Sequence, residues 1–118
     1  MADDLKPLSF VGSARKDMLK FPKAVRYDVG FDLYRVQQGK TPQSAKPLKG
    51  LTGVTEIVER YDTDTYRAVY VANLGGEVYV LHCFKKKSKR GIKTPKEDID
   101  VIKNRLRLAK EHSKKRRS

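Results

Sequence analysis

Apolar and polar residues alternate most regularly in the middle of the chain. The segments 54–61, 65–72 and 77–84 are rich in β-branched and aromatic residues, which favour strands. The turn-forming sequences Asp62–Asp64 and Asn73–Gly76 separate these segments. Three consecutive antiparallel strands are therefore predicted.

The same pattern predicts which side chains share a face of the sheet, because side chains alternate along a strand. In the second of the three strands, an arginine should share its face with two valines: Arg67, Val69 and Val71. In the third strand, four side chains are expected on one face: Val78, Val80, His82 and Phe84.

A strand and two helices are expected before this region. The apolar segment Pro7–Val11 is interpreted as a first strand, and Ser13 begins a short helix that ends before Pro22. The segment Lys23–Gln38 has apolar residues at helical spacing, and Gly39–Pro42 ends this second helix. A polar loop then leads to the central strands.

The last helix has the clearest boundary signal. The sequence Thr94–Glu97 supplies an N-cap, a first-turn proline and a capping-box glutamate in the expected order. Apolar residues follow along one side of the helix: Ile99, Ile102, Leu106 and Ala109. We expect the helix to end near Lys110, and residues 1–6 and 111–118 to be flexible.

The order of these elements indicates an α+β fold in a single domain. A length of 118 residues suits one domain, here 1–118. The expected architecture is a small antiparallel sheet packed by two N-terminal helices, with a basic C-terminal helix.

Positive charge is concentrated towards the C-terminus. The chain has a net charge of +13 at pH 7, and residues 85–118 contain 15 Lys and Arg but only 4 Asp and Glu. A concentrated positive field attracts polyanions and gives them a salt-dependent affinity. Nucleic acid is therefore the expected partner. The alternative is a solvated helix face that serves solubility.

The residue types present disfavour several kinds of site. The single cysteine, Cys83, has no second cysteine for an intramolecular disulfide, and no His or Cys spacing indicates zinc. Glycine-rich phosphate loops and nucleophile-elbow motifs are missing, so neither a metal nor a cofactor is expected. No apolar run reaches the ~20 residues that span a bilayer, so we expect a cytoplasmic protein without membrane contact.

The candidate chemistry is a set of cations near one end of the sheet. A basic run directly follows the third strand: Lys85, Lys86, Lys87, Lys89 and Arg90. The sheet should hold the first members of this run in place. In mid-strand, Arg67 either grips phosphate through two parallel hydrogen bonds or pairs with an acid such as Glu56 or Glu59.

Two ring side chains lead into this basic run. Phe84 can stack on a base while the cations bind phosphates, and packing in the core is the alternative for both Phe84 and His82. RNA carries its own nucleophile, the 2′-hydroxyl, so cleavage needs charge stabilisation and proton transfer. Arginine and lysine supply the charge, and His82 or a lysine with a lowered pKa is the candidate for proton transfer.

Taken together, these segments resemble the RelE/ParE toxin superfamily, in particular its phage-related HigB-like branch. The likeness covers residues 7–110 and rests on Asp64–Val71 and Val80–Ser88, followed by Thr94–Pro95. It implies a RelE-like fold whose antiparallel sheet becomes mixed at the first strand.

The resemblance also implies a function. The chain would be the toxin of a type II toxin–antitoxin system, a metal-independent and ribosome-dependent mRNA endoribonuclease neutralised by a cognate antitoxin of the helix-turn-helix type. The superfamily's mid-strand arginine falls on Arg67, and its second cation, at the end of the last strand, falls on Lys86 or a neighbouring residue, where RelE has arginine. The tyrosine that some relatives carry near the C-terminus has no counterpart, since no tyrosine follows Tyr79.

These inferences give a candidate site and two alternatives. The catalytic candidates are Arg67, Lys86 and His82, and the RNA-binding candidates are Phe84, Lys85, Lys87, Lys89 and Arg90. One alternative is a non-catalytic ParE-like inhibitor of DNA gyrase, and the other is a basic RNA-binding accessory protein. The pair of Arg67 and Lys86 favours the nuclease, although a fold by itself does not determine function.

Overall fold

A computed structural model describes residues 4–87 and 94–117 of the chain. In it, five strands form one sheet in the order β1-β5-β4-β3-β2. Their bounds are β1 Leu8–Phe10, β2 Ala45–Pro47, β3 Thr55–Tyr61, β4 Asp64–Leu74 and β5 Glu77–Lys87. β1 pairs with β5 in parallel, and the other neighbouring strands are antiparallel. The predicted α+β class and the mixed first strand are confirmed.

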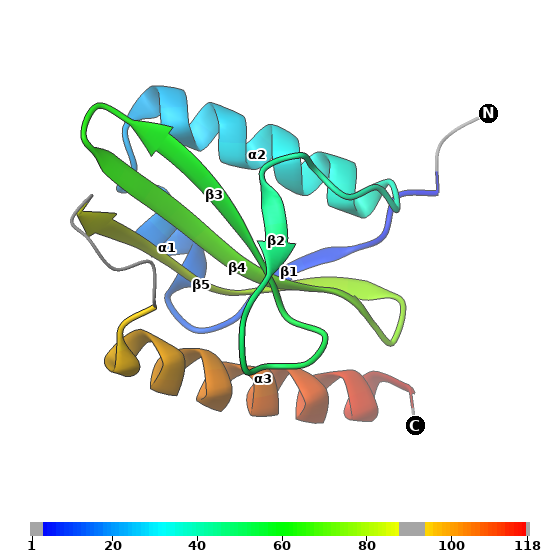
Figure 1. The fold of residues 1–118 in the computed structure, drawn as a ribbon. Helices are drawn as coiled ribbons and strands as arrows, with labels where there is room; N and C mark the ends of the chain where they lie inside the picture. The colour runs from blue at the N-terminus through cyan, green and yellow to red at the C-terminus, as the bar shows by residue number, and fades with distance from the viewer. Residues whose placement is uncertain (1–3, 88–93, 118) are drawn as a thin grey trace.

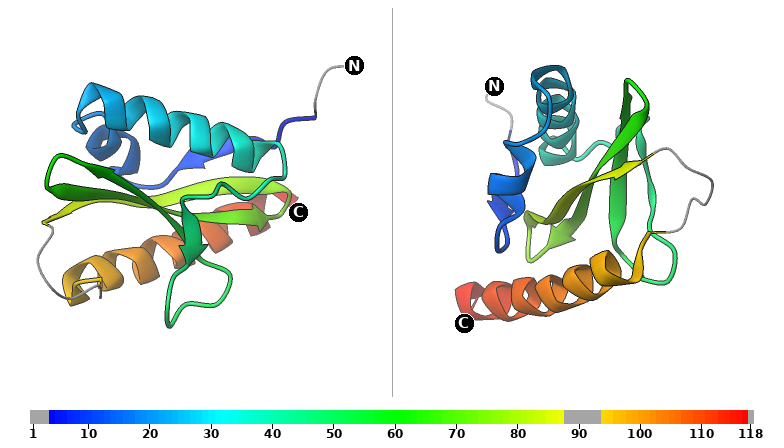
Figure 2. Two further views of the ribbon diagram at one scale, coloured as in Figure 1. Left: turned by 45° about the horizontal axis from the view of Figure 1, so that its top comes forward. Right: turned by 90° about the vertical axis from the view of Figure 1, so that its left-hand side faces the viewer.

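Three helices cover the two faces of this sheet. They are α1 (Ala14–Met18), α2 (Lys23–Gln37) and α3 (Lys96–Arg117). Figure 1 shows α2 along one face of the sheet and α3 along the opposite face, and the views in Figure 2 agree. The sheet is therefore the middle layer of three.

Each face of the sheet has its own hydrophobic core. On the α2 face, valines and a leucine of the helix pack on the sheet, and the buried sheet residues there include Ile57, Ala68, Tyr70, Val78, Val80 and Cys83. On the α3 face, the core consists of Leu48, Val54, Val69, Val71, Tyr79, Leu81, Ile102 and Ala109. Val69 and Val71 thus share a face, as the alternation predicts.

A β-bulge interrupts β5. The pairing between β4 and β5 slips by one residue after position 69, which leaves Leu81 as an extra residue in β5. Val78 and Val80 precede the bulge and pack towards α2, whereas Phe84 lies beyond it and packs towards α3. The predicted face shared by Val78, Val80, His82 and Phe84 is therefore wrong, because the bulge reverses the alternation. His82 also lies beyond the bulge, and its ring stacks on Phe84, so these two residues do share a face.

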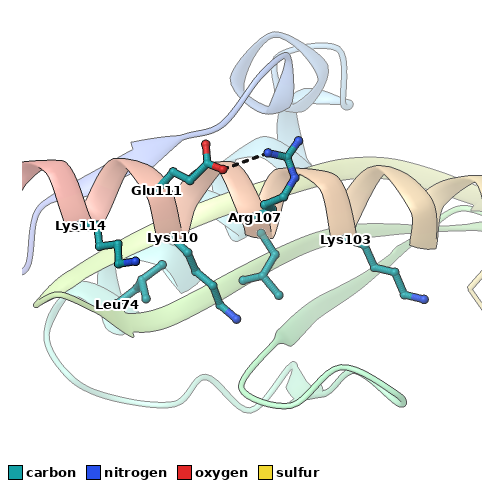
Figure 3. Close-up of a pocket in the computed structure, with 7 residues that line it drawn as sticks. Leu74, Lys103, Arg107, Lys110, Glu111 and Lys114 are labelled. Atoms are coloured by element: carbon teal, nitrogen blue, oxygen red, sulfur yellow. Dashed lines mark hydrogen bonds and ion pairs between the residues drawn. The ribbon is translucent and has the colours of Figure 1, made fainter.

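Several element bounds differ from the sequence expectation. β5 continues past Phe84 to Lys87, and the short β2 occupies part of the expected loop. The expected end of the last helix at Lys110 is also wrong, because α3 continues to Arg117. Ser113 in this last part is only 3% exposed, and Arg116 forms an ion pair with the buried Glu77. Several lysines of α3 extend from one side of the helix (Figure 3).

At the start of the chain, the segment expected to be flexible contains one anchored residue. The backbone amide of Lys6 donates to the carbonyl of Gln37 at 2.9 Å, and the Gln37 side-chain amide donates to the Lys6 carbonyl at 2.9 Å. The Lys6 ammonium also donates to the carbonyl of Ala72 at 3.2 Å. Lys6 therefore joins the end of α2 to β4.

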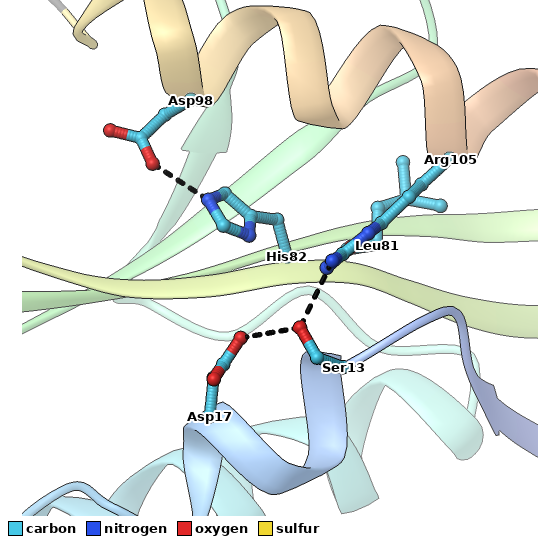
Figure 4. Close-up of polar contacts among 6 residues, drawn as sticks. All are labelled: Ser13, Asp17, Leu81, His82, Asp98 and Arg105. Carbon is cyan, nitrogen blue, oxygen red and sulfur yellow. Dashed lines mark hydrogen bonds and ion pairs between the residues drawn. The ribbon is translucent and has the colours of Figure 1, made fainter.

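Arg105 of α3 fastens this helix to β5 and α1. Its Nη1 donates to the carbonyl of Leu81 at 3.1 Å, and its Nη2 donates to Ser13 Oγ at 3.0 Å. Ser13 Oγ in turn donates to Asp17 at 2.8 Å (Figure 4). Gly12, with φ of +59°, makes room for the guanidinium, since a Cβ there would lie 2.7 Å from Arg105 Nε. One arginine therefore links three elements.

Within residues 4–87 and 94–117, no helix is long and apolar enough to cross a membrane.

Candidate functional site

Arg67 lies in the first half of β4, on the sheet face that α3 covers. It is 5% exposed, and its Nη1 donates to Oε1 of Glu56 on β3 at 2.9 Å. Glu56 is itself 4% exposed. Arg67 Nε is buried and has no hydrogen-bond partner within the described part of the chain. Of the two roles expected for Arg67, the structure therefore shows the pairing with an acid, and one of its donors stays uncommitted.

Lys86 lies on the same face as Arg67, two residues beyond the position of β5 that is opposite Arg67. The strand pairing sets Lys86 opposite Thr65 and Arg67 opposite Phe84. The pKa of Lys86 is lowered, and burial is the largest cause. The positive charges of Arg67 and Lys46 lower this pKa further, whereas the negative charge of Glu56 raises it. These four charged residues therefore form one electrostatic cluster with three cations and one carboxylate.

His82 joins this face of the sheet to the beginning of α3. Its Nε2 donates to Oδ1 of Asp98 at 2.7 Å, as Figure 4 shows. Its ring stacks on Phe84, with centroids 4.9 Å apart and planes at 19°. Asp98 is in the first turn of α3, where the helix dipole also favours a negative charge. The Nδ1 atom of His82 is buried without a hydrogen-bond partner among the described residues.

A pocket of about 540 Å³ lies beside this cluster. Its walls come from the segment Lys46–Leu51, from Glu56 and from three residues near the start of α3: Thr94, Ile99 and Lys103. Two members of the charged cluster, Lys46 and Glu56, line it. The cluster thus has access to a hollow of the size that small ligands and single nucleotides occupy.

Comparison with known proteins gives the chain a family. Residues 16–107 match the model of the family described as "Phage derived protein Gp49-like (DUF891)". The chain belongs to this family. The Gp49-like family is a RelE/HigB-type toxin family, so the resemblance seen in the sequence is confirmed.

Further comparisons add little to this Gp49-like assignment. One solved structure that is similar is the toxin–antitoxin complex RelBE2 from Mycobacterium tuberculosis. It has 21% sequence identity and a TM-score of 0.49, and the match covers 72% of this chain and 94% of that chain. No curated protein matches the chain.

In this Gp49-like chain, the lysines at the end of β5 do not all lie on one face of the sheet. Lys86 shares the face of Arg67, but Lys85 pairs across the strand with Tyr66, a residue of the α2-side core, and therefore lies on the other face. Lys85 is also 3.7 Å from Asp64. The backbone of Lys87 ends β5, and the remaining candidates, Lys89 and Arg90, lie outside the described residues.

Sequence reasoning missed three residues of the site. Lys46 was expected in a loop, because a three-residue strand that ends in proline has almost no periodic signal. Asp98 had a weak signal, since acids are common in the first turn of a helix. Ile99, which lines the pocket, was expected only to pack under the helix.

A second titratable pair lies on the α2 face, away from the candidate site. Burial raises the pKa of Glu59 to about 7, and the hydrogen bond and the negative charge of Asp32 add to the effect. Asp32 also accepts a hydrogen bond from Ser44 Oγ at 2.9 Å. This pair joins β3 to α2 and gives the fold a pH-dependent contact.

Proposed function

We propose that this protein is the toxin of a type II toxin–antitoxin system, acting in the cytoplasm as a metal-independent, ribosome-dependent mRNA endoribonuclease. The observation that carries the proposal is the placement of Arg67 and Lys86 on one face of the sheet, beside a pocket. Membership of a RelE/HigB-type toxin family supports the toxin role. The partners would be mRNA, the ribosome and a cognate antitoxin, of the helix-turn-helix type.

The charged cluster suits the transition state of RNA cleavage. In this reaction the 2′-oxygen forms a bond to phosphorus while the bond from phosphorus to the 5′-oxygen breaks. Negative charge accumulates on the phosphoryl oxygens as this happens, and preorganised cations stabilise it. Lys86 is half-buried and makes the direct contact with phosphate, whereas Arg67 is held behind it by Glu56 and supplies charge. Phe84, beside Lys86, stacks on a base.

The reaction also needs two proton transfers. The 2′-hydroxyl must lose its proton, which passes to water or to a group of the ribosome, and the leaving 5′-oxygen must gain one. Lys86, whose pKa is lowered, would protonate the leaving oxygen. His82 is the other candidate, through its unpartnered Nδ1, but this atom is buried. Lys86 is therefore the preferred donor, and His82 then serves to hold Phe84 and α3 in place.

The test is cleavage of a defined mRNA in a translation extract, with the new 5′ ends mapped. Lys86→Met keeps the aliphatic stem of the side chain and should lower the cleavage rate ~10²-fold, the usual cost of removing one charge-stabilising donor. Arg67→Lys keeps the charge and the pairing with Glu56, and should lower the rate less. Lys40→Met removes an exposed cation that follows α2, the helix on the opposite face of the sheet, and is the matched control.

Three results would contradict the proposal. Equal cleavage by wild type and Lys86→Met would show that Lys86 is not part of a catalytic site. Equal cleavage of the same mRNA without ribosomes would remove the ribosome dependence. Intact mRNA together with inhibited DNA gyrase would replace the nuclease by the gyrase-inhibitor alternative.

A further inference from the structure

A groove with an apolar floor and a cationic rim runs along the C-terminal half of α3. It has a volume of about 490 Å³. Leu74, near the tip of the β4–β5 hairpin, and Leu106 of α3 form its apolar part. The rest of the lining is almost entirely charged: Lys103, Arg107, Lys110, Glu111 and Lys114. This groove is separate from the pocket beside Arg67, which shares only Lys103 with it.

The charges of this α3 groove are unbalanced. Four cations line it but only one acid, Glu111, and that carboxylate accepts from Arg107 Nη1 at 3.1 Å. Figure 3 shows the Arg107–Glu111 pair on one side of α3, whereas Lys103, Lys110 and Lys114 extend on the other side, where Leu74 also lies. Lys103 and Lys110 are both exposed. The groove therefore combines an apolar contact with positive charge along one rim.

We infer that this α3 groove is a docking surface for an acidic amphipathic helix from a partner protein. Leucine or isoleucine side chains of the partner would cover Leu74 and Leu106, and its carboxylates would face the lysine rim. The stretch from Lys103 to Lys114 is about 17 Å long at 1.5 Å per residue, which matches a partner helix of about 12 residues. A cognate antitoxin is the source of such a helix, so this part of the inference rests on the proposed function.

The lining favours an acidic protein segment over RNA. RNA binds through phosphates on cations and through bases stacked on aromatic rings. The groove supplies cations, but its apolar part consists of two leucines and contains no aromatic ring. An amphipathic helix uses both parts of the groove, since aliphatic side chains at i, i+3 and i+4 bury against leucines.

The experiment measures binding of a labelled acidic peptide to the full chain by fluorescence anisotropy. The probe has about 12 residues, with leucines at helical spacing and glutamates elsewhere. A scrambled peptide of the same composition has no continuous leucine stripe. Lys110→Glu reverses one charge on the rim and places a glutamate four residues before Lys114, which supports the helix, so the variant should fold. Leu74→Ser removes part of the floor, and Lys23→Glu on α2 is the charge-matched control.

The expected result is that Lys110→Glu and Leu74→Ser each weaken binding about tenfold, while Lys23→Glu changes it less than about twofold. The scrambled peptide should also bind about tenfold more weakly. Lys110→Glu alone decides the test if Leu74→Ser does not fold.

Three outcomes would overturn the inference. Equal binding of the scrambled peptide would mean that the peptide binds through its charge alone and not through a leucine stripe. Displacement of the peptide by an oligouridine, with no effect of Leu74→Ser, would make the groove a phosphate-binding surface. Absence of peptide binding at low salt would mean that the groove is not a docking surface for an acidic helix.

A parallel cleavage assay separates this inference from the proposed function. Wild-type protein that binds the peptide but leaves mRNA intact would contradict the nuclease and keep the groove. Wild-type protein that cleaves mRNA but does not bind the peptide would support the nuclease and contradict the docking surface.

Discussion

Loss of Arg67 alone leaves the Glu56 carboxylate buried without its partner. The two side chains are 6% and 5% exposed, so the carboxylate depends on this guanidinium for much of its stabilisation. Breaking such a buried pair by removing one partner costs about 3–5 kcal/mol. Domains of this size have a free energy of unfolding of about 5–15 kcal/mol, so Arg67→Met removes a large part of it. The melting temperature should fall by about 10–25 °C.

A double-mutant cycle measures this contribution. Urea unfolding of wild type, Arg67→Met, Glu56→Leu and the double variant gives four free energies. Both single variants should be strongly destabilised, because each leaves one buried charge unpaired. The double variant should be about as stable as wild type or up to about 4 kcal/mol more stable, since it replaces two buried charges by apolar side chains. Lys86 and Lys46, the other two members of the charged cluster, stay unchanged in all four proteins.

A loss below about 1 kcal/mol in Arg67→Met would refute this reasoning, because it would mean that the pair behaves as a solvated one. A double variant less stable than both single variants would refute it as well. The result also decides how the cleavage assay is interpreted. If Arg67→Met unfolds, loss of cleavage by that variant says nothing about catalysis, and only Arg67→Lys and Lys86→Met test the site.

Three further predictions concern packing, pH and proton transfer. Gly12→Ala should cost about 2–4 kcal/mol in urea unfolding, because it strains a positive φ and displaces Arg105, whereas Gly30→Ala on the open face of α2 should stabilise by up to about 1 kcal/mol. The pKa of Glu59 is raised from 4.5 to about 7 in the folded state, so stability should fall as pH rises from about 4.5 through about 7. Glu59→Gln should remove this loss, and an unchanged pH dependence of the melting temperature would contradict it. Because the pKa of Lys86 lies below its ordinary value, cleavage should decline at a pH below the usual lysine range. Lys86→Arg should remove that decline in single-turnover cleavage at varied pH.

The three central strands and the helix α2 could be predicted from the sequence because their signal is local. Alternation in β4 depends only on the residues of that strand, so the face shared by Val69 and Val71 was predicted correctly. The bulge at Leu81 depends on how β5 pairs with β4, and no local pattern contains that information. The last turns of α3 were missed for the same reason, since the contact of Arg116 with Glu77 joins distant parts of the chain.

The candidate site divides in the same way. The sequence by itself determined that Arg67 is a lone cation within its strand and that a basic run follows the next strand. The sequence also determined the family likeness. Tertiary structure decided that Glu56 neutralises Arg67, that Lys86 and not Lys85 of the basic run shares its face, and that His82 binds Asp98. The physical reason is that residue types and spacing fix local conformation and charge. Which charges meet, and which of them are removed from water, depends on strand register and on the packing of α3 across the sheet.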